Sequence, residues 1–119
     1  MRQLRRKYEV VVWWASSIEG QSALKRLLQE NQIFQAAYDE SVKRLEIQSE
    51  TWREILPSDK VRELAKTIIK TQNLRTLDAL QLAAALVWCF ENPTGRIFVC
   101  CDDKLSEAAR KIGFAVLPK

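Results

Sequence analysis

The chain has 119 residues, of which 47% are hydrophobic and 29% charged, with three glycines and three prolines. This composition fits one folded α/β domain spanning residues 1–119 and excludes collagen-like and intrinsically disordered chains. The chain contains no histidine, which excludes Ser-His-Asp catalysis, Cys-His catalysis and His-ligated zinc. If the protein is an enzyme, carboxylates assisted by a hard divalent cation are the expected machinery.

The net charge of +4 is concentrated at the N-terminus. Arg2, Arg5, Arg6 and Lys7 supply four positive charges, and the other 15 basic residues balance 15 acidic ones. This basic arm either contacts RNA phosphates or is a solvated end of the chain. No apolar run approaches the roughly 18 residues of a membrane-spanning helix, and no signal peptide is visible. We therefore expect a cytoplasmic protein with no membrane partner.

The first predicted elements are a buried strand and a helix. Glu9–Ala15 (EVVVWWA) is a continuous apolar run, typical of a parallel strand that is buried on both faces. Ser16, with Glu19 three residues later, forms a predicted capping box for a helix that ends near Glu30. That helix is expected to bury its apolar residues, which are Ile18, Ala23, Leu24, Leu27 and Leu28.

Three further elements follow in the middle of the chain. A second helix is predicted over Phe34–Gln48, and Thr51–Leu56 is a predicted short edge strand. Ser58 is the expected N-cap of a third helix over Asp59–Thr71.

The next helix is the most apolar part of the chain. Thr76 is its expected N-cap, and Leu77–Phe90 (LDALQLAAALVWCF) is apolar on nearly all sides, which is typical of a helix at the centre of a core. A turn is predicted at Asn92–Gly95.

The C-terminal part alternates strand, helix and strand. Ile97–Cys101 (IFVCC) is a predicted buried strand, and Asp102 is the expected N-cap of a helix over Asp103–Ile112. Gly113 ends this helix, and Phe114–Leu117 forms the last strand. Alternating strands and helices predict a parallel sheet.

The cysteines and tryptophans are expected mainly to pack in the core. The cysteines (Cys89, Cys100 and Cys101) are odd in number, which argues against a disulfide framework and favours packing as small hydrophobes. The four tryptophans are expected mainly in the core, with an interface as the alternative.

Three acidic residues are predicted to lie close together at one edge of the sheet. Glu19 and Asp78 fall in the first turns of their helices, and Asp102 directly follows a strand. Ligands of open parallel sheets bind outside the carboxyl ends of the strands, where these carboxylates should meet. Carboxylates pressed together repel one another unless a cation lies among them, and Mg²⁺ or Mn²⁺ there would activate a water to attack a phosphodiester. Taken singly, each residue is better explained as a helix cap or first-turn acid, so the case for a site rests on their convergence.

Two segments resemble hallmark stretches of PIN-domain proteins. Leu77–Ala83 (LDALQLA) resembles the start of a family helix, and Phe98–Leu105 (FVCCDDKL) resembles a strand that ends in an aspartate. The tail Glu107–Pro118 is similar to the tails of VapC-type toxins, and Glu19 matches the acidic position that precedes an "AL" pair. These motifs keep their order and spacing over roughly residues 8–118.

The resemblance implies a PIN-like three-layer domain, with a central parallel sheet flanked by helices. It implies a toxin-antitoxin ribonuclease that depends on Mg²⁺ or Mn²⁺, with an RNA substrate and a cognate antitoxin as partners. Glu19, Asp78 and Asp102 take the catalytic and metal-binding roles in this interpretation, with Asp103 as a possible auxiliary ligand. The family's first strand and its aspartate have no counterpart here, from which we expect a truncation or a late start codon. The gap left by that strand predicts a homodimer.

Two alternatives remain open from the sequence. The first is a catalytically inactive PIN-fold module that binds an antitoxin, another protein or RNA. The second is a purely structural α/β domain whose acidic residues are all helix caps.

Overall fold

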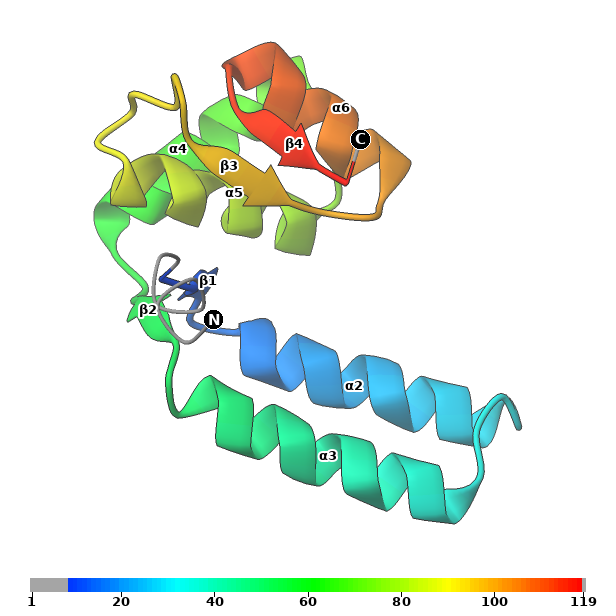
Figure 1. The fold of residues 1–119 in the computed structure, drawn as a ribbon. Helices are drawn as coiled ribbons and strands as arrows, with labels where there is room; N and C mark the ends of the chain where they lie inside the picture. Colours follow the sequence, from blue (N-terminus) through cyan, green and yellow to red (C-terminus); the bar gives the residue numbers. More distant parts are fainter. Residues whose placement is uncertain (1–8, 119) are drawn as a thin grey trace. The chain divides into compact units, whose positions relative to one another are not determined.

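The computed structural model describes residues 9–118 and divides the chain into two units, which are taken in turn (Figure 1). Unit 1 is Met1–Glu54 and unit 2 is Ile55–Lys119. The described residues combine helices with short strands, so the prediction of a mixed α/β fold is confirmed at that level. The strands of residues 9–118 form two two-stranded sheets, β1–β2 and β3–β4. The basic arm predicted at Arg2–Lys7 lies outside the described residues.

Unit 1 is a helical hairpin preceded and followed by a short strand. Strand β1 (Val11–Trp13) leads into α2 (Ser16–Gln29), α3 (Gln35–Ser49) follows, and β2 (Arg53–Ile55) pairs with β1. The two helices lie side by side (Figure 1). They approach closely at Gly20, where a β-carbon would lie only 2.9 Å from Cδ2 of Leu45. Glycine at this position is therefore part of the helix contact.

The predicted capping box of α2 is wrong. The N-cap is Ala15, whose backbone is helical (φ −86°, ψ 0°), and no side chain caps the helix. Ser16 is already the first helical residue, because the chain turns into α2 immediately after β1. A capping side chain needs an extended backbone at the cap position, which this turn does not provide.

The burial predicted for unit 1 is also wrong. No residue of α2 or α3 is buried, and Ile18 is 63% exposed. Of the predicted strand Glu9–Ala15, only Trp13 is buried, whereas Trp14 is 46% exposed. Two helices that pack on one another cover only one narrow stripe of each, so most apolar side chains remain at the surface.

Unit 2 is built on a second helical hairpin. Helix α4 (Asp59–Thr71) and helix α5 (Thr76–Trp88) pack along one another. A salt bridge of 2.8 Å joins Lys60, at the start of α4, to Glu91, just after the end of α5. The two helices therefore run antiparallel.

The α4–α5 contact contains the core of unit 2. As predicted, α5 is central: it carries five buried residues and contacts both α4 and α6. Phe114 also joins this core, where its ring centroid lies 5.6 Å from that of Phe98. The fully enclosed side chains of the hairpin include Val61, Ala79, Leu82, Ala83 and Ala84.

The rest of unit 2 is a strand, a helix and a strand. Strand β3 (Ile97–Val99) pairs in parallel with β4 (Ala115–Leu117), and α6 (Asp103–Ile112) connects them. The register places Ile97 opposite Ala115, Phe98 opposite Val116 and Val99 opposite Leu117. The predicted burial of the IFVCC strand is wrong, because Val99 is 74% exposed and Cys101 is exposed.

Local signals predicted the helix ends of unit 2 well, with one exception. The Ser58 side chain accepts a hydrogen bond from Val61 N at 3.2 Å, and Asp102 Oδ1 accepts one from Leu105 N at 2.9 Å. Gly113 ends α6 with a φ of 123°, which favours glycine. The exception is Thr76, which is the first residue of α5 rather than its cap, a position held by Arg75.

Within residues 9–118, none of the helices has the length and apolar character needed to cross a bilayer.

Leu82→Ala is expected to lower the free energy of unfolding by about 2–5 kcal/mol, because it leaves a cavity where a side chain has no exposed surface. Leu77→Ala is the matched control on the same helix, since Leu77 is 52% exposed. Its expected effect is within about 0.5 kcal/mol. Urea denaturation of both variants measures the difference, and equal losses would contradict the assigned core.

A candidate carboxylate site

Asp78 and Asp102 are the two predicted site residues that the structure brings near one another. Asp78 is half-buried in the first turn of α5, and Asp102 caps α6 three residues after the end of β3. The packing of α6 against α5 places the beginnings of these two helices in the same part of unit 2. The charge of Asp102 acts on Asp78 as a result.

The electrostatics of Asp78 follow from this placement. Burial raises the pKa of Asp78 above its ordinary value, and the negative charge of Asp102 raises this pKa further. The positive charge of Arg75 opposes both effects. The ionised form of Asp78 is therefore held at a net cost, which a cation near both carboxylates would reduce.

Arg75 is the charged neighbour that the sequence prediction missed. It is the N-cap of α5, three residues before Asp78, and its side chain is exposed. A basic residue three positions before Asp78 in the sequence could have indicated this interaction. It was missed because the helix was expected to begin after a cap at Thr76.

The other two predicted ligands have different placements. Glu19 lies in the first turn of α2, in unit 1, so its convergence with Asp78 and Asp102 stays a prediction. Asp103 is the exposed first residue of α6, and the charges that act on Asp78 within residues 9–118 are those of Asp102 and Arg75. In the described part of the chain, no three His, Cys, Asp or Glu side chains gather closely enough to hold a metal ion.

The donor set at the Asp78–Asp102 pair fits a hard cation that is only partly held by protein. Carboxylate oxygens suit Mg²⁺ and Mn²⁺. Mg²⁺ commonly takes one or two carboxylates and fills its remaining positions with water and substrate phosphates. Two carboxylates near one another in unit 2 are the number of protein ligands that such a cation commonly takes.

The cysteine beside the pair has a local structural role. Asp102 N donates a hydrogen bond to Cys100 Sγ at 3.3 Å, and Ser106 Oγ donates one to the Cys100 carbonyl oxygen at 3.2 Å. These contacts fix the chain between β3 and α6. All three cysteines are free, and Cys89 is buried as predicted.

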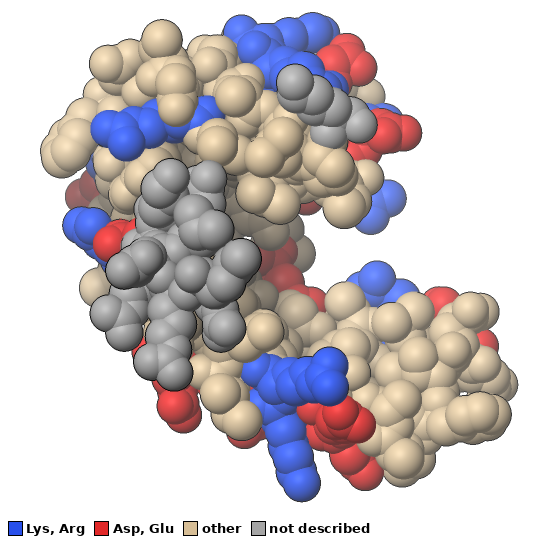
Figure 2. Space-filling view, viewed as in Figure 1, with Lys and Arg blue, Asp and Glu red and all other residues tan. Residues whose placement is uncertain are grey.

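Charged side chains do not gather into one basic face in the view of Figure 2. Lys and Arg are interspersed with Asp and Glu on the visible surface of each unit. Several of them form exposed ion pairs along helices, such as Arg44–Glu40 and Lys111–Glu107. Among the described residues of either unit, this view therefore shows no extended basic track of the kind that binds nucleic acid.

No protein-family model, curated protein or solved structure matches the chain.

Asp78→Asn should change the pH dependence of stability. A carboxyl with a raised folded-state pKa binds its proton more tightly in the folded chain, so its contribution to stability falls as pH rises from the unfolded to the folded pKa. Asn imitates the protonated form of Asp78. The melting temperature of the variant minus that of the parent should therefore increase as the pH rises from about 3 to about 6. Thermal denaturation across this range measures the trend.

An Asp102→Asn background is the control for this trend. In this background Asp78→Asn should cause a smaller increase in melting temperature with pH, because one of the two causes of the raised pKa of Asp78 has been removed. A melting-temperature difference that falls with rising pH would contradict the assigned environment of Asp78.

Proposed function

We propose that the chain is a divalent-metal-dependent endoribonuclease of the PIN-domain, VapC-like type. The observation that carries the proposal is the placement of Asp78 near Asp102: burial raises the pKa of Asp78, and the negative charge of Asp102 raises this pKa further. Both residues lie in the two segments that resemble PIN-domain proteins. The three-layer PIN-like fold is part of the same proposal.

The roles of the residues follow from their positions. Asp78 and Asp102 offer oxygen ligands, and Glu19 is the proposed third carboxylate, with Asp103 as an auxiliary. When bound, the cation supplies a water activated for attack on the phosphodiester and neutralises charge on the phosphate. Asp102 is held in place by its hydrogen bond from Leu105 N, and Asp78 lies in the first turn of the central helix α5.

The proposed partners come from the family resemblance. They are an RNA substrate, a cognate antitoxin protein and a second copy of the chain. An absence of histidine is compatible with this chemistry, because a metal-bound water needs no imidazole base.

Cleavage of a mixed single-stranded RNA in Mn²⁺ tests the proposal. Asp102→Asn should lower the cleavage rate by more than the roughly 10–100-fold that loss of an outer-shell partner costs. Asparagine is also a good N-cap, so α6 should remain folded in this variant. Gel analysis of end-labelled RNA gives the rates.

Asp59→Asn is the matched control for cleavage. Asp59 is also a first-turn acid of unit 2, but it lies at the start of α4, which the antiparallel hairpin places at the opposite end from the start of α5. This variant should cleave at the parent rate. Equal cleavage by Asp102→Asn and the parent would refute the proposed site.

Mn²⁺ should also stabilise the folded chain in a way that depends on the pair. A ligand that binds only the folded state at about 100 times its Kd adds roughly 2.7 kcal/mol of stability. The melting temperature of the parent and of Asp59→Asn should therefore rise with Mn²⁺, whereas that of the Asp78→Asn/Asp102→Asn double variant should not. Differential scanning fluorimetry measures the shift, and an equal rise in the double variant would place the cation elsewhere.

A second candidate function is a catalytically inactive PIN-fold module that binds an antitoxin, another protein or RNA. The favouring observation is that, among the described residues of unit 2, no third acidic side chain gathers with Asp78 and Asp102. RNA binding without Mn²⁺-dependent cleavage, and unchanged by Asp78→Asn, would support this module over the nuclease.

A further inference from the structure

Two adjacent cysteines, Cys100 and Cys101, follow β3 in unit 2. Cys100 is partly buried, Cys101 is exposed, and both thiols are free. Because the two residues are neighbours in the sequence, the covalent chain alone keeps their sulfurs close, whatever else packs around them. The nuclease chemistry proposed above uses neither thiol.

The side chain of Cys100 is directed along the chain toward Asp102. Its Sγ accepts a hydrogen bond from Asp102 N at 3.3 Å and donates one to the Asp102 carbonyl oxygen at 3.5 Å. A side chain that bonds to the backbone two residues further on closes a tight turn around the residue between them. Cys100 Sγ therefore already extends in the direction of Cys101, which is the direction it must take to meet the second sulfur.

Cys101 links two residues that are anchored more firmly than itself. Cys100 N donates a hydrogen bond to Leu117 O at 2.9 Å, and the Cys100 carbonyl oxygen accepts one from Ser106 Oγ at 3.2 Å. Asp102 is the N-cap of α6. Within residues 9–118, Cys101 itself forms no hydrogen bond. A rotation at Cys101 therefore breaks no hydrogen bond of its own, but it displaces Asp102.

We propose that Cys100 and Cys101 form a reversible oxidation site, which a low-molecular-weight disulfide such as oxidised glutathione closes to a disulfide, and that closure displaces Asp102. The Cys101 sulfur attacks one sulfur of the oxidant, which forms a mixed disulfide and releases one thiol. The Cys100 sulfur then attacks the Cys101 sulfur and releases the second thiol. The protein gives up two electrons and two protons, and these reduce the oxidant to its two thiols.

The closed pair is strained, and this makes it reversible. Adjacent α-carbons lie about 3.8 Å apart, which is shorter than the separation of about 4.4–6.8 Å that most disulfides span. Strained disulfides are more easily reduced, so closure needs an excess of oxidant and a thiol reopens the pair. Closure also removes the Cys100 thiol proton and redirects Sγ to Cys101, so the turn that holds Asp102 is lost.

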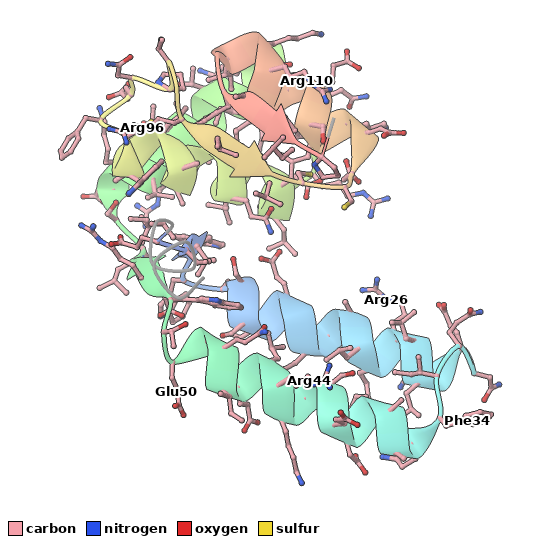
Figure 3. All side chains as sticks on the ribbon, viewed as in Figure 1. Arg26, Phe34, Arg44, Glu50, Arg96 and Arg110 are labelled. Atoms are coloured by element: carbon pink, nitrogen blue, oxygen red, sulfur yellow. The ribbon has the colours of Figure 1, made fainter. Side chains whose placement is uncertain are left out.

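Peptide mass mapping after treatment with excess oxidised glutathione tests the oxidation site. Trypsin cleaves after Arg96, which directly precedes β3 (Figure 3), and after Lys104, so one peptide contains both cysteines and another contains Cys89. Remaining thiols are alkylated before digestion. The peptide 97–104 of the parent should lose the mass of two hydrogen atoms and regain it with dithiothreitol. Cys89→Ala should behave as the parent does.

Amide hydrogen exchange in EDTA tests the displacement of Asp102, without a cation to hold its carboxylate. Leu105 N is the reporter, because it donates to Asp102 Oδ1 at 2.9 Å. Oxidation of the parent should speed exchange at this amide about fivefold, the effect of losing a typical cap. The Cys100→Ser/Cys101→Ser variant is the matched control: serine also bonds to the backbone two residues on, and the oxidant should leave its exchange unchanged.

Several results would overturn the oxidation site. They are a peptide 97–104 that stays reduced in excess oxidant, one that keeps a glutathione without closing, and one that is joined instead to the peptide containing Cys89. An unchanged exchange rate at Leu105 in the closed form would overturn the displacement of Asp102.

The effect of closure on RNA cleavage rests on the proposed function. Oxidation should lower the Mn²⁺-dependent cleavage rate of the parent and leave that of the Cys100→Ser/Cys101→Ser variant unchanged. An equal rate in the open and closed parent would overturn this control of the site. Absence of cleavage in the reduced parent would refute the nuclease alone, because peptide mass and hydrogen exchange report on the cysteine pair without it.

Discussion

The packing of α5 against α4 is the contact on which the rest of unit 2 depends. Helix α5 is apolar on nearly all sides, so it is stable in water only when it is enclosed. Leu82 and Val61 meet this requirement between the two helices, and α6 and Phe114 complete the enclosure. Burial of the helix also determines the environment of its first turn. Asp78 is half-buried because its helix is central, and this burial is the main cause of its raised pKa.

Unit 1 also contains a helical hairpin, but neither of its helices is enclosed as α5 is in unit 2. Helices α2 and α3 are as long as α4 and α5, yet neither contains a buried residue. Isolated helices of about 12–15 residues are marginal in water, so each depends on the stripe that it shares with the other. The close approach at Gly20 makes this stripe as tight as the backbone allows. Large apolar side chains that remain exposed in this unit include Ile18, Phe34 and Ile47.

Sequence patterns predicted the elements of the chain better than their burial. Ser58, Asp102 and Gly113 were placed correctly because a helix end is decided by a few neighbouring atoms. Ser16 and Thr76 carried the same signal, but the preceding chain already has a geometry that makes each the first helical residue. Burial depends on elements far apart in sequence. The IFVCC run has the composition of a central strand, yet the described chain pairs it on one side only. At the candidate site, local sequence motifs identified Asp78 and Asp102 as site residues but did not identify Arg75 as their charged neighbour.

Capping explains Asp78 and Asp102 separately, but it does not explain why they lie near one another. Asp102 stabilises α6 through its hydrogen bond from Leu105 N, and an acid in the first turn of α5 interacts favourably with the helix dipole. Bringing the two carboxylates together opposes these gains, because burial and the nearby charge of Asp102 both disfavour the charge on Asp78. Asparagine at position 78 would avoid the repulsion, and asparagine at position 102 would still cap α6. A fold that retains both acids at this cost has the electrostatic character of a site that receives a positive charge.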